Sequence, residues 1–275
     1  MNAPSTSARP SGLTPEHVEA FQRDGYCVVD GLWSADEIAE IEAFFEEFRR
    51  VGTPVFDSGA RYEDIDPTKR QLRAMHPHRY SDRVKAWALN PRVLDALKVL
   101  FASEPLLAQT MYYFKPPGAK GQGMHQDNFY LLAAPHTCIA AWTAIDSAGT
   151  DNGCLFVVPG SHRKDIICPA GEAEPWMSYG DTHIKPFPKD MKAVPVIVPR
   201  SSTMFFGGNL IHGSGPNRTA DRSRRTFIGH YIDNVSEEVA GFYHPVLDRR
   251  GEIVSRLKAP EGGGPCGDGW LGATH

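Results

Sequence analysis

Two histidines and one aspartate have the residue types and the order of a metal site. His125 and Asp127 are two residues apart in Met124-His125-Gln126-Asp127, and residues at this spacing on an extended chain project to the same face. His212, in a Gly-rich stretch further along, could supply a third ligand. Two imidazoles and one carboxylate on one face of an octahedron leave three positions open, which suits an iron that binds a chelating cosubstrate and O2. We therefore predict a metal site at these three residues.

A candidate anion-binding cation follows the third ligand. Arg224 lies about a dozen residues beyond His212, at the start of the apolar, strand-like stretch 226–231. A guanidinium held in place can bind a carboxylate in bidentate fashion, and the far carboxylate of 2-oxoglutarate needs such a group. The neighbouring Arg222 and Arg225 are alternatives for this role. We predict Arg224.

Each candidate also has a purely structural explanation, because a histidine can be a satisfied core residue and an aspartate a turn former. The joint pattern favours the metal site. His162 follows the turn Pro159-Gly160-Ser161, which favours a role in holding that loop by hydrogen bonding. His76 and His78 flank Pro77, whose fixed dihedral makes a shared metal awkward, so we place them near the site entrance and outside the metal set.

The first hundred residues are predicted to be mainly helical. Thr14-Pro15 has an N-cap residue followed by Pro at the first helical position, which predicts a helix to about Asp24, where Gly25 ends it. A short strand is expected over 26–32, and the capping box of Ser34 and Glu37 predicts a second helix to about Arg50. Asn90-Pro91 predicts a further helix to about Phe101.

From about residue 106 the pattern changes to short apolar runs separated by Gly, Pro, Asn and Asp, which is typical of a sandwich or barrel. The expected strands are 107–114, 137–145, 154–158, 194–198, 203–206 and 225–232. We predict one catalytic domain over 13–260 with its core at about 106–232. Residues 1–12 are expected to be a disordered tail and 261–275 a Gly-rich tail.

Seven patches in this order resemble the phytanoyl-CoA dioxygenase (PhyH) family of Fe(II)/2-oxoglutarate-dependent oxygenases. They are Lys115-Pro116-Pro117, His125-Gln126-Asp127, Ala141-Trp142-Thr143-Ala144, Asn152-Gly153-Cys154-Leu155, Val158-Pro159-Gly160-Ser161-His162, His212-Gly213-Ser214-Gly215-Pro216-Asn217 and Arg224. The resemblance is close over about 106–231. The N-terminal helical part fits in outline, and the last forty residues add little.

The resemblance implies an all-β core with helices (α+β), namely a double-stranded β-helix (jelly-roll, cupin-like) braced by N-terminal helices. It also implies roles by position. His125, Asp127 and His212 would be the catalytic iron ligands, and Arg224 would pair with the far carboxylate of 2-oxoglutarate. Trp142 and Met111 would line the cosubstrate pocket, and Gln126 and Asn128 would face the substrate.

The implied activity is that of a dioxygenase using Fe(II), 2-oxoglutarate and O2. It would hydroxylate an aliphatic C–H bond of a small metabolite or natural-product intermediate and release succinate and CO2. The same cofactor chemistry could instead end in desaturation, cyclisation or epimerisation. A different class, a metal-holding β-sandwich that binds a ligand without redox turnover, is the second alternative. The segments 62–80 and 165–189 are the expected pocket walls.

Composition limits the partners. The chain has 275 residues, and its 29 Lys and Arg against 33 Asp and Glu give a net charge of -4 without a basic block, so neither nucleic acid nor an anionic membrane is expected as a partner. No apolar run approaches the roughly 20 residues of a membrane span, and the polar start has no signal core. We expect a cytoplasmic enzyme with a small-molecule substrate. The five scattered cysteines are interpreted as reduced thiols.

Overall fold

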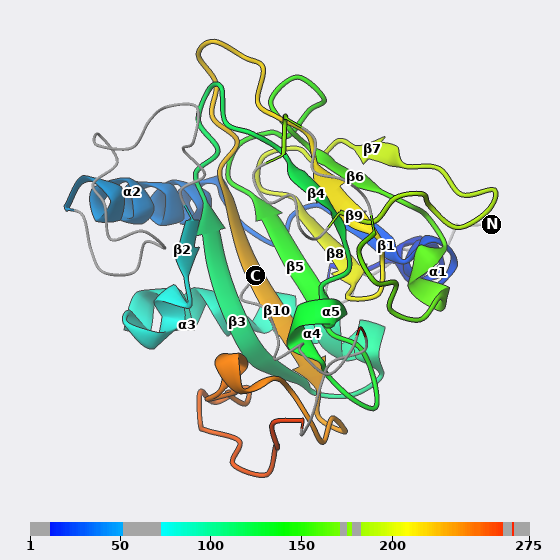
Figure 1. Cartoon of the computed structure of the whole chain (residues 1–275). Coiled ribbons are helices and arrows are strands. Elements are labelled where there is room, and N and C mark those ends of the chain that lie inside the picture. The colour runs from blue at the N-terminus through cyan, green and yellow to red at the C-terminus, as the bar shows by residue number, and fades with distance from the viewer. Residues whose placement is uncertain (1–11, 52–72, 171–174, 178–182, 261–265, 267–275) are drawn as a thin grey trace, which may run out of the picture.

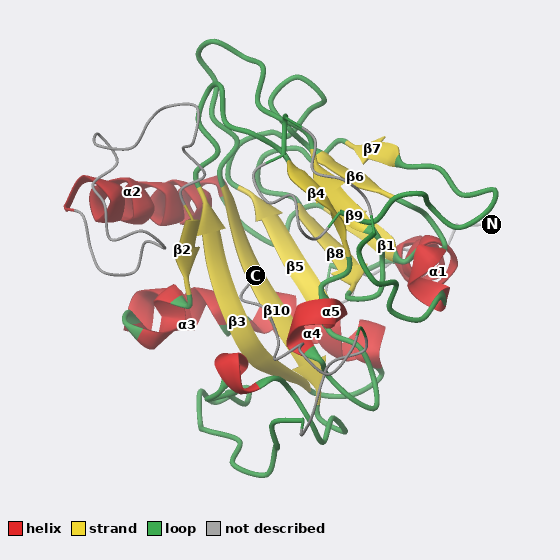
Figure 2. Cartoon of the chain, in the orientation of Figure 1, coloured by secondary structure: helices red, strands yellow, loops and turns green. Residues whose placement is uncertain are grey.

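The computed structural model describes residues 12–51, 73–170, 175–177, 183–260 and Cys266. Two antiparallel sheets face each other (Figure 1). The major sheet has the strand order β1-β8-β5-β10-β3-β2, and the minor sheet has the order β4-β9-β6-β7. Figure 2 shows that helices gather around the major sheet, whereas long loops border the minor sheet. This arrangement is the predicted jelly-roll with bracing helices, so the predicted fold class is confirmed.

The helical elements are α1 (Pro15–Asp24), α2 (Ala35–Val51), η3 (Pro77–Arg79), α3 (Asp82–Ala88), α4 (Pro91–Phe101), α5 (Asn128–Leu131), η4 (Ser161–Arg163) and η5 (Gly241–Tyr243). The strands are β1 (Tyr26–Val29), β2 (Arg73–Met75), β3 (Pro105–Tyr113), β4 (Gln122–His125), β5 (Ile139–Ala144), β6 (Leu155–Val157), β7 (Val194–Val196), β8 (Thr203–Gly207), β9 (His212–Ser214) and β10 (Thr226–Asp233).

Local capping chemistry sets the N-terminal helices where the sequence predicts them. Thr14 accepts a hydrogen bond from the backbone of α1, and Gly25 ends that helix at a φ of 88°, a conformation that glycine adopts at little cost. The Ser34 hydroxyl accepts from the Glu37 backbone while the Glu37 carboxylate accepts from the Ser34 backbone. This is the predicted capping box, and it fixes the start of α2.

The helices cover the outer face of the major sheet. Phe45 of α2 stacks on Tyr112 of β3 with ring centroids 3.9 Å apart, and Leu94 and Leu97 of α4 belong to the same buried cluster. Burying a side chain of this size contributes about 1.5–3 kcal/mol. The helical layer therefore holds the major sheet rigid, and the inner face of that sheet is left to form the site.

The prediction of five reduced thiols is wrong for two of them. Cys168 and Cys266 form a disulfide across a sequence separation of 98 residues, whereas Cys27, Cys138 and Cys154 are buried free thiols. Spacing along the chain gives no warning of such a bond, because only the fold brings the partners together. The predicted tails lie outside the described residues, apart from Gly12 and Cys266.

Among the described residues, no helix has both the length and the apolar character needed to cross a bilayer.

Candidate functional site

The three predicted ligands converge between the two sheets. His125 ends β4 and His212 begins β9, and these strands pair antiparallel with the two histidines opposite each other. Their ring centroids are 4.3 Å apart. Asp127 does not continue the strand, because its backbone is helical (φ -62°, ψ -36°) and it is the N-cap residue just before α5. The carboxylate reaches the histidines through this turn, and the extended His-x-Asp geometry expected from the sequence is wrong.

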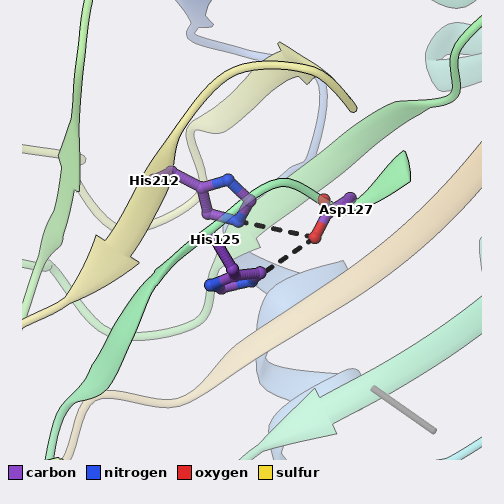
Figure 3. Close-up of side chains that lie close together, drawn as sticks. All are labelled: His125, Asp127 and His212. Atoms are coloured by element: carbon purple, nitrogen blue, oxygen red, sulfur yellow. Dashed lines mark ion pairs between the residues drawn. The ribbon is translucent and has the colours of Figure 1, made fainter. Parts of the chain in front are cut away.

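The ligand atoms point toward one another (Figure 3). Asp127 Oδ1 lies 3.6 Å from His125 Nε2 and 3.5 Å from His212 Nε2, and all three side chains are buried. His125 Nδ1 lies 2.8 Å from the carbonyl of Gly123, and His212 Nδ1 lies 3.0 Å from the carbonyl of Leu210. A carbonyl only accepts, so each Nδ1 carries the proton and donates, and each Nε2 presents a lone pair.

The buried environment of His212 also favours a neutral imidazole. Burial lowers the pKa of His212 to about 4, because the desolvated ring disfavours the charged form. Two imidazole lone pairs and a carboxylate oxygen, gathered out of water, are a donor set that a divalent metal satisfies. Among the described residues, this is the cluster of potential ligands that fits a metal ion.

His230 holds the second oxygen of the aspartate, and the sequence analysis missed it. This buried residue of β10 lies with its Nε2 3.0 Å from Asp127 Oδ2. The bond orients the carboxylate so that Oδ1 faces the two histidines, as partners behind metal ligands commonly do. A signal was present in the sequence, since His230 and Ile228 are two residues apart in a predicted strand and therefore point to the same face of the sheet.

Arg224 lies in the same cavity as the three ligands, together with Met111 and Trp142. Its Nε donates to the carbonyl of Gly153 at 3.0 Å, and its guanidinium carbon lies 5.4 Å from the centre of the Trp142 ring. No carboxylate of the described residues pairs with this cation. Burial lowers the pKa of Arg224 to about 10, so it stays charged at neutral pH and is able to bind an anion.

The two alternative arginines point elsewhere. The side chain of Arg222 is 55% exposed and pairs with Asp151 on the surface. Arg225 is bound by Asp146, Glu42 and Glu46 outside the cavity. Of the three candidates, Arg224 alone lines the cavity with the metal ligands.

Lys115 adds a buried amine to the end of the cavity where Arg224 lies. Its Nζ donates to Ser214 Oγ at 2.9 Å, and it lines the cavity with Arg224. Burial and the positive charge of Arg224 hold the pKa of Lys115 well below its ordinary value. In the sequence, Lys115 stood out only as part of a motif, but its position beside Arg224 assigns it to the anion-binding end of the cavity.

Gln126 and Asn128 have their side chains engaged with the backbone. The Gln126 amide donates to Asn209 at 2.8 Å and accepts from Ile167 at 2.7 Å. The Asn128 amide accepts from and donates to Ala133. To bind a substrate, each would have to give up bonds that hold the loops around the metal ligands. Their substrate role stays a prediction.

Glycine is required beside the third ligand. A Cβ on Gly213 would lie 2.8 Å from the carbonyl oxygen of Gln122, so only a residue without a side chain lets β9 approach β4 here.

His162 was predicted to hold its loop by hydrogen bonding, and its Nε2 lies 3.2 Å from the carbonyl oxygen of Gln22. Of the expected pocket walls, 62–72, 171–174 and 178–182 lie outside the described residues.

Solved structures share this architecture. The carbocyclase SnoK from nogalamycin biosynthesis aligns with a TM-score of 0.66 at 19% identity, covering 86% of this chain and 89% of that chain. The epimerase SnoN, solved with Fe3+ and alpha ketoglutarate, aligns at 0.64 and 22% identity, covering 90% and 95%. EctD from S. alaskensis, solved with 2-oxoglutarate and 5-hydroxyectoine, aligns at 0.66 and 20% identity, covering 94% and 91%. These likenesses show the fold.

Sequence comparison shows the family. Phytanoyl-CoA dioxygenase domain-containing protein 1 from Bos taurus is 26% identical over 270 residues, covering 80% of this chain and 90% of that protein. Phytanoyl-CoA dioxygenase 1 from Oryza sativa subsp. japonica is 29% identical over 266 residues, covering 82% and 91%. The family model described as phytanoyl-CoA dioxygenase (PhyH) matches residues 21–226. With the buried His125-Asp127-His212 cluster in the same region, this match leads to one conclusion: the chain belongs to the phytanoyl-CoA dioxygenase family.

Proposed function

We propose that this protein is an Fe(II)- and 2-oxoglutarate-dependent dioxygenase that hydroxylates an aliphatic C–H bond of a small metabolite or natural-product intermediate. One observation carries the proposal. Two buried imidazole lone pairs and a carboxylate oxygen meet in a cavity that also contains Arg224, a buried cation with no carboxylate partner among the described residues. A set of metal ligands beside a buried cation that has no carboxylate partner fits an iron ion with a dicarboxylate cosubstrate.

His125, Asp127 and His212 would hold the iron, and Arg224, with the amine of Lys115 beside it, would hold the far carboxylate of 2-oxoglutarate. With O2, the bound cofactors supply an oxidant for C–H bonds and leave succinate and CO2 as coproducts. The protein's own contribution is placement and exclusion of water. The hydrogen bond from His230 fixes the Asp127 carboxylate. Met111 and Trp142 line the cosubstrate region with apolar surface beside Arg224 and Lys115.

Related folds leave a second outcome open at the substrate carbon. SnoK is described as a carbocyclase and SnoN as an epimerase, so cyclisation, epimerisation or desaturation is the alternative within the same cofactor chemistry. A binding module without turnover is the alternative outside it. Substrate-dependent succinate release separates turnover from mere binding, and product mass separates hydroxylation, which adds one oxygen atom, from the other outcomes.

The experiment compares succinate release by the wild-type protein, His125→Ala and Asp127→Ala against a substrate panel. We expect release from wild type and none from either variant, with circular dichroism showing that all three fold. Normal activity in either variant would remove the metal assignment.

The domain and location predictions are part of this proposal. We propose that 13–260 form a single catalytic domain. A cytoplasmic location is also proposed, and the Cys168–Cys266 bond is the observation against it, because disulfides are rare in a reducing cytosol.

A further inference from the structure

Three buried polar side chains near the candidate metal site have no hydrogen-bond partner for their side chains among the described residues. They are His76, Gln109 and Tyr243, with exposed fractions of 4%, 0% and 0%. Both ring nitrogens of His76, both amide atoms of Gln109 and the hydroxyl of Tyr243 lack such a bond. Buried polar groups are normally bonded, since leaving them unsatisfied costs stability. We call these three residues the polar cluster.

The polar cluster lies on the Asp127 side of the metal ligands. Gln109 of β3 is the register partner of His230 on β10, and His230 bonds Asp127 at 3.0 Å. The ring of His76 lies 6.1 Å from the ring of Tyr243. Burial raises the pKa of Tyr243 well above its ordinary value, and the nearby charge of Asp127 adds to this effect. The cluster therefore adjoins the metal site through Asp127 and His230.

His76 is also held in an uncommon backbone conformation. Its φ is 51° and its ψ is 39°, in the left-handed region, just before the short helix η3. A residue other than glycine adopts this conformation at a cost, and such costs concentrate at functional sites. Strain and unsatisfied polar groups coincide here, which is the combination expected where stability is given up for binding.

The atoms of the cluster select the chemistry of a ligand. Burial lowers the pKa of His76 to about 2, with the neighbouring Arg79, His78 and His230 adding to the shift, so its imidazole is neutral. A neutral imidazole, a carboxamide and a phenol together offer both donors and acceptors and are themselves uncharged, although the charges of Arg79 and Arg73 act on His76 and Tyr243. A carboxylate or phosphate would leave the acceptors unmatched, and an ammonium group would leave the donors unmatched.

We propose that His76, Gln109 and Tyr243 form a substrate subsite that binds an uncharged group with both donors and acceptors, namely a hydroxyl, a vicinal diol or a carboxamide. This subsite would hold the substrate beside Asp127, and that role rests on the proposed dioxygenase function. The polar recognition itself does not require iron or 2-oxoglutarate.

The first test compares two buried glutamines. Gln109 has no side-chain hydrogen bond among the described residues, whereas Gln126 is equally buried and bonds Asn209 and Ile167. We expect Gln109→Met to leave the melting temperature unchanged or to raise it, because no bond is lost. Gln126→Met should lower it by more than about 4 °C. An equal fall in both variants would make Gln109 a structural residue and overturn the proposal.

The second test measures binding with four probes that share one ring: cis-1,2-cyclohexanediol, cyclohexanecarboxamide, cyclohexanecarboxylate and cyclohexylammonium. Saturation-transfer NMR would use protein loaded with 2-oxoglutarate and Zn(II), which has no redox chemistry. We expect the two uncharged probes to give the stronger signals, and these should fall at least threefold in Gln109→Met and in Tyr243→Phe. Charged probes that bind as well, or uncharged probes unaffected by both variants, would overturn the proposal.

The two proposals fail in different ways. The visible band of the Fe(II)–2-oxoglutarate complex in the wild-type protein tests the cofactor assignment alone. A missing band together with normal probe binding would remove the dioxygenase function and keep the polar subsite. A normal band with no selective probe binding would keep the dioxygenase function and remove the polar subsite.

Discussion

Arg224→Met removes the buried guanidinium that we assign to the far carboxylate of 2-oxoglutarate. Hydrogen bonds to a charged group contribute about 1.5–3 kcal/mol each. We take a total loss of about 3 kcal/mol, because Lys115 remains in the cavity beside the carboxylate. Since 1.4 kcal/mol is a factor of ten, the Kd for 2-oxoglutarate should rise about 100-fold. Arg224→Lys keeps the charge and loses the bidentate geometry, so it should cost about tenfold.

The assay is an anaerobic titration of the Fe(II)-loaded protein with 2-oxoglutarate, followed by the visible band of the complex. Arg222→Met is the matched control, because it removes an identical group two residues away, where the side chain is 55% exposed and paired with Asp151. That control should change the Kd by no more than about twofold.

Equal Kd values for Arg224→Met and Arg222→Met would refute the assignment. A larger effect in the Arg222 variant would refute it as well. Circular dichroism at the assay temperature shows that each variant is folded, which matters because Arg224 also donates to the carbonyl of Gly153.

Three further predictions concern the metal, pH and the thiols. His230→Leu removes the bond to Asp127 and should weaken Fe(II) binding about 10- to 100-fold in a metal titration, whereas unchanged affinity would contradict the orienting role. Burial lowers the pKa of His78 to about 3, below the unfolded value near 6.5, so the unfolded state takes up the proton first. The contribution of His78 to the free energy of unfolding should fall by up to about 1.4 kcal/mol per pH unit from about pH 6.5 to 3, so His78→Gln should make the total pH dependence in urea melts less steep; equal slopes would count against it. Alkylation after denaturation without reductant should modify three cysteines rather than five, and five would mean that the bond is absent from the purified protein.

The parts of the fold that local chemistry encodes could be predicted from the sequence. Thr14 and Gly25 bound α1, and Ser34 with Glu37 starts α2, because capping is settled within a few residues. The short apolar run over 225–232 likewise predicted β10. Three short strands were missed, whereas β6 and β7, with three residues each, were predicted from their apolar runs. β2, β4 and β9 have three or four residues each, too few to show a period, and they form through partners distant in sequence.

The candidate site was predicted in composition more than in geometry. His125, Asp127, His212 and Arg224 come together in one cavity as expected, but Asp127 arrives through a helical turn. His230 was missed because its role depends on the fold, which brings β10 against the turn that carries Asp127. The Cys168–Cys266 bond was missed for the same kind of reason, since its partners are 98 residues apart. Residue types and spacing indicate chemistry, whereas contacts between distant segments require the fold.

The most direct test of the central claim is the visible absorption of anaerobic protein with Fe(II) and 2-oxoglutarate, compared between wild type and His212→Ala. We expect a weak charge-transfer band in wild type that is lost in the variant, because His212 is one of the three groups assigned to the metal. A folded, metal-loaded wild-type protein without the band, or a variant that keeps it, would overturn the iron and 2-oxoglutarate assignment.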